Sequence, residues 1–282
     1  MKSIAQITAF VLITSQITSI TSEKSINGYN KERKWSKLDI DLTTFTIKSD
    51  QVILMKSTEV LAKESKFVKG FYFEFNKNIE YLPIKIHEKF PNLVAYDGAN
   101  LALKGIKYQN FEKLEELQYL TLKENPISYM SPDVFKDLTK LKYLILRLNQ
   151  LNYIDEELFK NLGNLIHLDL DKNQINFLPK GIFENMPELQ EFSLSDNKLQ
   201  ELDGDSFGKN KKLETIWLDG NDLKILSVTM FDDLDKLKVV YLKGNDCVDS
   251  NFCANSDCSL KFSDMKTRIK DFCKLTEMKE VQ

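Results

Sequence analysis

The chain has 282 residues, of which 42% are apolar and 29% are charged, and its formal net charge at pH 7 is −3. This balance is ordinary for a folded protein, and the lack of a basic excess argues against nucleic acid as a partner. The length suits one elongated domain or two compact ones.

The N-terminal residues 1–22 have the pattern of a secretory signal peptide. Lys2 precedes an apolar run, and the small residues Ser19, Thr21 and Ser22 suit a cleavage site. Polar residues interrupt the run, which makes a membrane anchor the weaker alternative. Because no later stretch is apolar enough to cross a bilayer, we expect a secreted, extracellular protein without membrane insertion.

The segment 23–66 begins as a polar arm and then becomes strand-like. From Trp35 onward, apolar residues alternate with polar ones, as at Phe45 and Ile47, which is the pattern of short strands. We expect residues 35–66 to form an N-terminal cap that covers the apolar edge of the repeats that follow.

A nine-residue motif recurs six times between Leu117 and Asn245, and each copy starts 24 residues after the previous one. The copies are LQYLTLKEN, LKYLILRLN, LIHLDLDKN, LQEFSLSDN, LETIWLDGN and LKVVYLKGN. Self-similarity at a fixed period is typical of a solenoid, whose units bury their apolar faces against one another. Less regular copies begin at Val68 and Leu93, which gives about eight repeats over 67–245 and favours one elongated domain.

Four positions of the repeat have predictable structural roles. The apolar fourth and sixth residues are two apart, so they point to one face of a strand, and one strand per repeat makes a parallel sheet. An asparagine follows each strand, and its buried amide can bond the backbone of the bends. These asparagines are Asn125, Asn149, Asn173, Asn197, Asn221 and Asn245. A phenylalanine column at the nineteenth position is expected in the core, namely Phe111, Phe135, Phe159, Phe183, Phe207 and Phe231.

The motif L-x-x-L-x-L-x-x-N resembles that of the leucine-rich repeat family, in its extracellular 24-residue form. The segments FVKGFYFEFNKNIEYLP and FPNLVAYDGANLALKGI resemble the opening repeats of secreted insect leucine-rich repeat proteins, among them proteins linked to innate immunity. The resemblance implies an α/β-type solenoid, a horseshoe with a parallel sheet on its concave face, an N-terminal strand cap and a disulfide-bonded C-terminal cap. It also implies that ligands meet the concave face.

The C-terminal residues 246–282 are predicted to form a cysteine-containing cap and tail. Four clustered cysteines after a signal peptide suggest two disulfides, and their spacing lacks the C-x2-C pairs of most zinc sites. Apolar residues spaced as on one helix face predict a short helix, namely Leu260, Phe262, Met265, Ile269 and Phe272. We expect a Cys247–Cys273 bond to hold this helix over the last repeat, and Cys253 and Cys258 to close a small loop. This arrangement matches the cysteine-rich cap of the family.

Strand residues that point away from the core form the predicted ligand-binding face. They are Tyr119, Tyr143, Ile145, Arg147, His167, Asp169, Asp171, Glu191, Asp196, Trp217, Asp219 and Tyr241, with Leu148 beside them. Large side chains on a rigid sheet can anchor a protein partner, and the acidic residues can attract a basic one. The alternatives are cross-strand packing of the aromatic rings and an ordinary solvated charged face.

Catalysis has little support in the sequence. His87 and His167 are the two histidines, and His167, Asp169 and Asp171 on one strand would spread over roughly 13 Å, too far for one metal ion. We therefore predict a non-enzymatic protein without a cofactor that binds a protein or microbial surface ligand, as a monomer or possible homodimer. The alternative is a structural or adhesive extracellular protein, which would self-associate.

Overall fold

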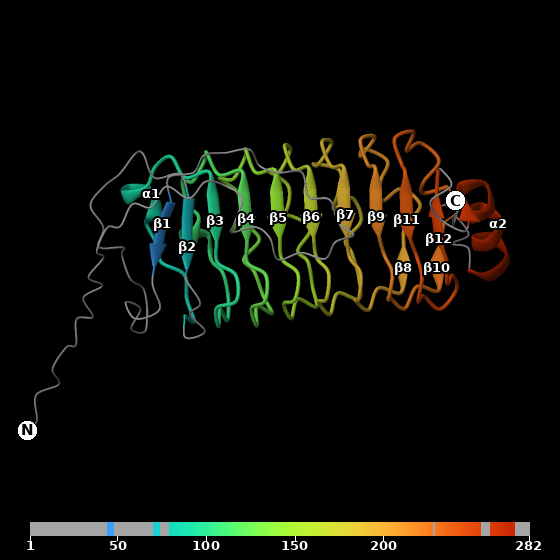
Figure 1. Ribbon diagram of the computed structural model, residues 1–282, viewed down its shortest axis with the longest axis horizontal. Helices are drawn as coiled ribbons and strands as arrows, with labels where there is room; N and C mark the ends of the chain where they lie inside the picture. Colours follow the sequence, from blue (N-terminus) through green and yellow to red (C-terminus); the bar gives the residue numbers. More distant parts are fainter. Residues whose placement is uncertain (1–43, 48–69, 74–78, 228, 255–259, 274–282) are drawn as a thin grey trace, which may run out of the picture.

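The computed structural model describes residues 44–47, 70–73, 79–227, 229–254 and 260–273. Its main element is a long sheet in which the strands follow one another along the molecule (Figure 1). In order, its strands are β1 (Thr44–Ile47), β2 (Gly70–Phe73), β3 (Ala95–Asp97), β4 (Tyr119–Thr121), β5 (Tyr143–Ile145), β6 (His167–Asp169), β7 (Glu191–Ser193), β9 (Thr215–Trp217), β11 (Val239–Tyr241), β12 (Asn251–Cys253) and β13 (Leu260–Lys261).

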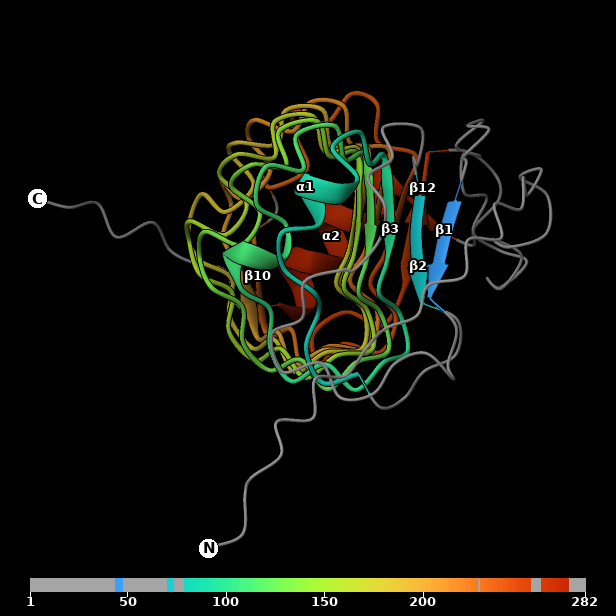
Figure 2. The same ribbon diagram turned by 90° about the vertical axis from the view of Figure 1, so that its left-hand side faces the viewer.

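The smaller elements lie between and beyond these strands. A second sheet pairs β8 (Glu201–Leu202) with β10 (Ile225–Leu226), and the helices are α1 (Ile86–Lys89), the 3-10 helix η2 (Tyr108–Asn110) and α2 (Phe262–Phe272). Figure 2 shows β10 across the coil from β2, β3 and β12. None of the helices in the described part of the chain is long and apolar enough to cross a membrane.

The strand pairing confirms the predicted parallel solenoid. From β2 to β11 each predicted repeat supplies one strand, and neighbours pair in parallel with equivalent positions in register, as Tyr119, Tyr143 and His167 do. The antiparallel pairing of β12 with β11 marks the start of the C-terminal cap. β1 extends the sheet at the other end, within the predicted N-terminal cap. The rest of that cap, and the predicted signal peptide and arm, lie outside the described residues.

The core contains the residues that the repeat pattern places there. The leucines of the fourth and sixth positions are buried, and so is every phenylalanine of the predicted column. Phe183 and Phe207 stack with ring centroids 5.2 Å apart, and Phe111 and Phe135 do so at 6.3 Å. Burying rings of this size on each turn is a main source of stability in the coil.

The buried asparagine column joins each repeat to the one before it. Asn173 Oδ1 accepts a hydrogen bond from Leu151 N at 3.1 Å, while its Nδ2 donates to Leu146 O at 3.1 Å and to Leu170 O at 3.0 Å. Equivalent bonds recur at the other asparagines of the column. This confirms their predicted structural role.

The residue before each of these asparagines has a left-handed backbone. Its φ lies between 54° and 59° at Glu124, Leu148, Lys172 and Asp196. The same position is glycine in the next two repeats, with φ of 67° and 75°. The left-handed turn ends the strand and directs the asparagine side chain back into the coil.

The C-terminal cap has the predicted helix and the predicted Cys247–Cys273 disulfide, with Cα atoms 4.7 Å apart. Met265 and Ile269 are buried on one helix face. The prediction that Leu260 lies on the helix is wrong, because Leu260 pairs with β12 as part of β13 and the helix begins only after it. Cys253 is also disulfide-bonded, and its predicted partner Cys258 lies outside the described residues.

Replacing one amide of the asparagine column should weaken the whole coil. We expect Asn173→Ala to lower the free energy of unfolding by roughly 2 kcal/mol, because the buried N–H of Leu151 loses its acceptor. The carbonyls of Leu146 and Leu170 each lose one of two donors. Urea denaturation measures this change. Asn176→Ala is the matched control, since Asn176 is exposed in the same repeat, and it should change stability by under about 0.5 kcal/mol. Equal effects of the two substitutions would contradict the structural role.

Candidate functional site

The outward face of the main sheet carries two rows of side chains, one from the first and one from the last residue of each strand. Parallel pairing in register places equivalent residues beside one another, so Thr121, Ile145, Asp169 and Ser193 form one continuous row. The register continues through β9 and β11, where Trp217 and Tyr241 occupy the same row. We refer to this surface as the sheet face.

Aromatic rings stack along the sheet face. Trp217 and Tyr241 lie parallel, with planes 1° apart and centroids 5.8 Å apart. Tyr143 lies between Tyr119 and His167, with centroids 6.4 Å from each. The four Tyr and Trp side chains are half-buried. Cross-strand packing is therefore present, and it leaves part of each ring at the surface.

Hydrogen bonds connect the acidic side chains in the middle of the sheet face. His167 Nδ1 lies 2.8 Å from Glu191 Oε2. The carboxylate of Asp171 accepts a hydrogen bond from Ser195 N at 2.8 Å and another from the Ser193 hydroxyl. The Ser195 hydroxyl in turn donates to Asp219 at 2.7 Å. These contacts position the carboxylates as a connected network.

Several predicted site residues are not exposed as expected. Ile145, His167, Asp169 and Asp171 are each at most 3% exposed, so the prediction that they project into solvent is wrong for these four. Equivalent side chains on adjacent strands lie within one strand spacing, and they cover each other while the serines bond the carboxylates. Glu191, Arg147 and Asp219 are half-buried, and Asp196 and Leu148 are exposed.

Burial changes the acidity of this network. Burial and, to a smaller extent, the neighbouring negative charge of Asp171 together raise the pKa of Asp169 from 3.8 to about 6, against the opposing effects of His167 and Arg147. Burial also raises the pKa of Asp219. With a pKa of about 6, Asp169 changes its charge in mildly acidic solution.

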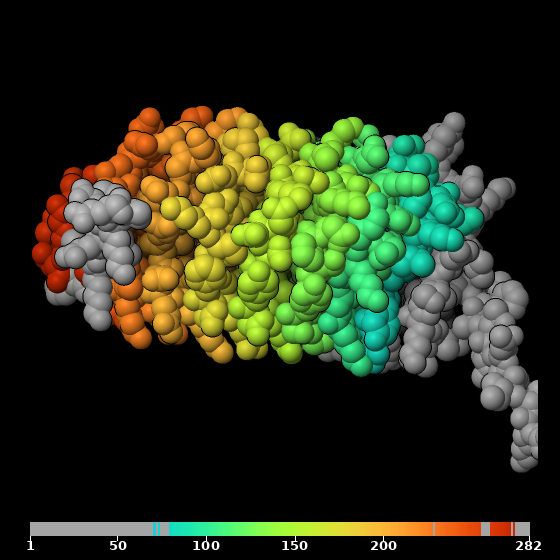
Figure 3. Space-filling view, turned by 180° about the vertical axis from the view of Figure 1, so that it is seen from behind, coloured from blue at the N-terminus to red at the C-terminus, as the bar shows by residue number. Residues whose placement is uncertain are grey.

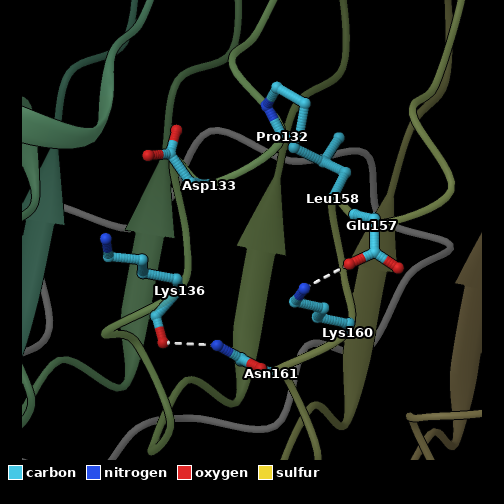
Figure 4. Close-up of a pocket in the computed structure, with 7 residues that line it drawn as sticks. All are labelled: Pro132, Asp133, Lys136, Glu157, Leu158, Lys160 and Asn161. Atoms are coloured by element: carbon cyan, nitrogen blue, oxygen red, sulfur yellow. Dashed lines mark hydrogen bonds and ion pairs between the residues drawn. The ribbon is translucent and has the colours of Figure 1, made fainter.

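A cavity of about 240 Å³ lies on the outer side of two repeats (Figure 4). It is lined by Pro132, Asp133, Lys136, Glu157, Leu158, Lys160 and Asn161. Lys160 forms an ion pair with Glu157, and Asn161 Nδ2 donates to Lys136 O at 2.8 Å. Lys136 Nζ also lies 3.7 Å from the centroid of the Tyr108 ring. Within the described residues no three His, Cys, Asp or Glu side chains are placed to hold a metal ion.

Three aromatic side chains outside the sheet face are more exposed than any of its rings. Tyr129, Tyr153 and Phe177 are 62%, 55% and 49% exposed. They occupy the thirteenth position of three consecutive repeats. The sequence-based prediction of ligand contacts includes only strand residues and misses these three, although their 24-residue spacing is visible in the sequence.

The repeat architecture matches a known family model. The leucine rich repeat model matches residues 98–151, 139–199 and 187–246, which together make up more than half of the chain. The chain belongs to the leucine-rich repeat family. No curated protein is similar enough to count as a match.

A similar solved structure comes from a crystal of a TLR13–ssRNA13 complex. It is 25% identical, with a TM-score of 0.59, over 64% of this chain and 26% of that one. The chain described here thus spans about a quarter of the length of the TLR13 chain. Modules of this family typically bind ligands and are typically non-enzymatic, which is the function class that the family supports.

The raised pKa of Asp169 predicts a pH-dependent stability. The folded protein holds this proton more tightly than the unfolded chain, so its stabilising effect is complete below about pH 4 and is lost as the pH rises through about 6. In Asp169→Asn, the decline in the free energy of unfolding over this window should be smaller by at most about 3 kcal/mol. Urea denaturation at a series of pH values tests this, with the exposed Asp205→Asn as control. An unchanged slope in Asp169→Asn would show that the carboxyl titrates normally.

Proposed function

We propose that this leucine-rich repeat protein is a secreted, non-catalytic recognition protein that binds a protein or microbial surface ligand through the sheet face, with a role in innate immunity. The observation that carries the proposal is the parallel Trp217–Tyr241 pair, half-exposed on two strands of a rigid sheet. Large rings held in a fixed orientation bury much area on binding at a low entropic cost.

Charge around this pair favours a basic or neutral partner. Asp219 follows Trp217 by two residues and is half-buried. Asp196 is exposed in the preceding repeat, where it lies 3.6 Å from Lys172 Nζ. Carboxylates in these places attract cationic groups and speed their encounter with the sheet face.

The same charge argues against nucleic acid as the ligand. The similar solved structure is of a complex that contains single-stranded RNA. Nucleic-acid binding depends on Lys and Arg side chains that neutralise phosphates. Because the half-buried carboxylates Glu191 and Asp219 lie in the middle of the sheet face and the chain has a net charge of −3, we propose a ligand other than RNA.

Two observations support export. Residues 1–22 have the pattern of a signal peptide. The Cys247–Cys273 disulfide also suits an oxidising compartment.

The stacked pair should dominate ligand binding. We expect Trp217→Ala to weaken binding by about 2 kcal/mol or more, which is roughly 30-fold in Kd, because the largest anchor is removed. The measurement is biolayer interferometry against peptidoglycan, lipopolysaccharide, single-stranded RNA and immobilised secreted proteins. Each probe that binds is then titrated with the variant.

The control is Lys209→Ala, an exposed change in the outer segment of the repeat that contains β7. It should leave Kd unchanged. Binding that survives Trp217→Ala would remove the sheet face from recognition. Light scattering addresses the structural alternative, because a large self-assembled species without affinity for any probe would favour an adhesive protein.

Secretion can be tested separately from recognition. When the full chain is expressed in insect cells, we expect it in the medium with a new N-terminus between residues 20 and 23, as a signal peptidase requires small residues before the cut. N-terminal sequencing measures this. Deletion of residues 2–22 should retain the protein inside the cells, and export of that deletion variant would contradict the assignment.

A further inference from the structure

A second candidate binding surface lies on the outer side of the coil. We define the outer aromatic row as Tyr129, Tyr153 and Phe177, the exposed rings at the thirteenth repeat position. In the following two repeats this position starts β8 and β10, and Figure 2 shows β10 across the coil from the main sheet. Figure 3 views the molecule from behind, where successive repeats lie side by side as diagonal bands.

The backbone beneath the row is fixed on both sides of each ring. Three residues before Tyr153, Gln150 N donates to Ile127 O of the preceding repeat at 2.9 Å, and Gln174 N makes the equivalent bond to Leu151 O at 2.8 Å. The residue after each ring, such as Ile154, lies in or against the core. These bonds hold the backbones of neighbouring repeats roughly 5 Å apart beneath the row, which is the usual spacing of hydrogen-bonded strands.

The surroundings of the row are polar but uncharged. The tenth and twelfth positions of the same three repeats are exposed. They are occupied by Pro126, Ser128, Gln150, Asn152, Gln174 and Asn176. Since 29% of the chain is charged, a surface of three repeats with no ionisable group at these positions is a distinct chemical environment. The row ends where Glu201 takes the thirteenth position.

We propose that the outer aromatic row binds a neutral, extended, β-linked polysaccharide. The C–H faces of successive sugar rings stack on aromatic side chains, and the backbone spacing beneath the row is comparable to the length of one sugar unit in such a chain. The amides beside the rings offer both donors and acceptors, which suits hydroxyl groups along the edge of a sugar.

The charges nearby exclude other ligands. A nucleic acid could stack its bases on the rings, but its phosphates would find no cation at the tenth, twelfth or thirteenth position of the three repeats. Within a few residues after the row, the acidic Asp133, Asp155 and Glu156 outnumber the basic Lys180, so an acidic polysaccharide would be repelled. A neutral glycan meets neither penalty.

Affinity electrophoresis with the full protein tests the proposal. Gels containing hydroxyethyl cellulose, a neutral β-linked glucan, should retard migration, whereas carboxymethyl cellulose, its anionic counterpart, should retard it less. We expect Tyr153→Ala to weaken binding about tenfold or more, because the central ring is lost. Tyr153→Phe should keep the affinity, because the ring face remains. Retardation should also be insensitive to salt, since no charges pair.

Two controls separate this surface from the sheet face. Trp217→Ala should leave glycan binding unchanged, so failure of the two proposals can be distinguished. The unfolding midpoint of Tyr153→Ala should match that of the unmodified protein, because the side chain is exposed. The proposal is overturned if neither hydroxyethyl cellulose nor soluble β-1,3-glucan retards the protein, or if Tyr153→Ala is retarded as strongly as the parent.

Discussion

The structure depends on the buried asparagine amide at the end of each strand. Its oxygen accepts a backbone N–H of the preceding repeat, and its amino group donates to carbonyls of both repeats. An unpaired buried backbone group is costly, so each asparagine fixes where the next turn of the coil must lie. The left-handed residue before it allows the side chain to reach this position. Register between strands follows from the repetition of this contact along the coil.

Constant register makes every repeat position a row on the surface of the molecule. On the sheet face the rows bring Trp217 onto Tyr241 and join carboxylates into one network through Ser193 and Ser195. On the outer side the same period places an exposed ring at the thirteenth position of three consecutive repeats. The two surfaces differ in chemistry, because one is acidic with stacked anchors and the other is uncharged with separate rings. A solenoid can thus present two independent recognition surfaces without any change in its core.

The two ends of the coil lack a neighbouring repeat to cover them, so they need a cap. An open repeat would leave unpaired backbone groups and apolar core at its edge. At the C-terminal end β12 reverses direction against β11, and α2 follows, linked back to the last repeat by the Cys247–Cys273 disulfide. Met265 and Ile269 supply the apolar contact. The cap therefore ends the sheet and protects the core together.

The sequence by itself determined the coil, the strand positions and the asparagine and phenylalanine columns. It could do so because a strict period of 24 residues gives every residue the same place relative to its own backbone. Only the tertiary structure decided which outward residues remain at the surface. The period indicates that Ile145, Asp169 and Trp217 point the same way, yet the first two are buried and the third is half-exposed. The repeat pattern likewise does not predict that Tyr129, Tyr153 and Phe177 are exposed. Exposure depends on which side chains the adjacent repeats place beside a residue, and the sequence period does not contain that information.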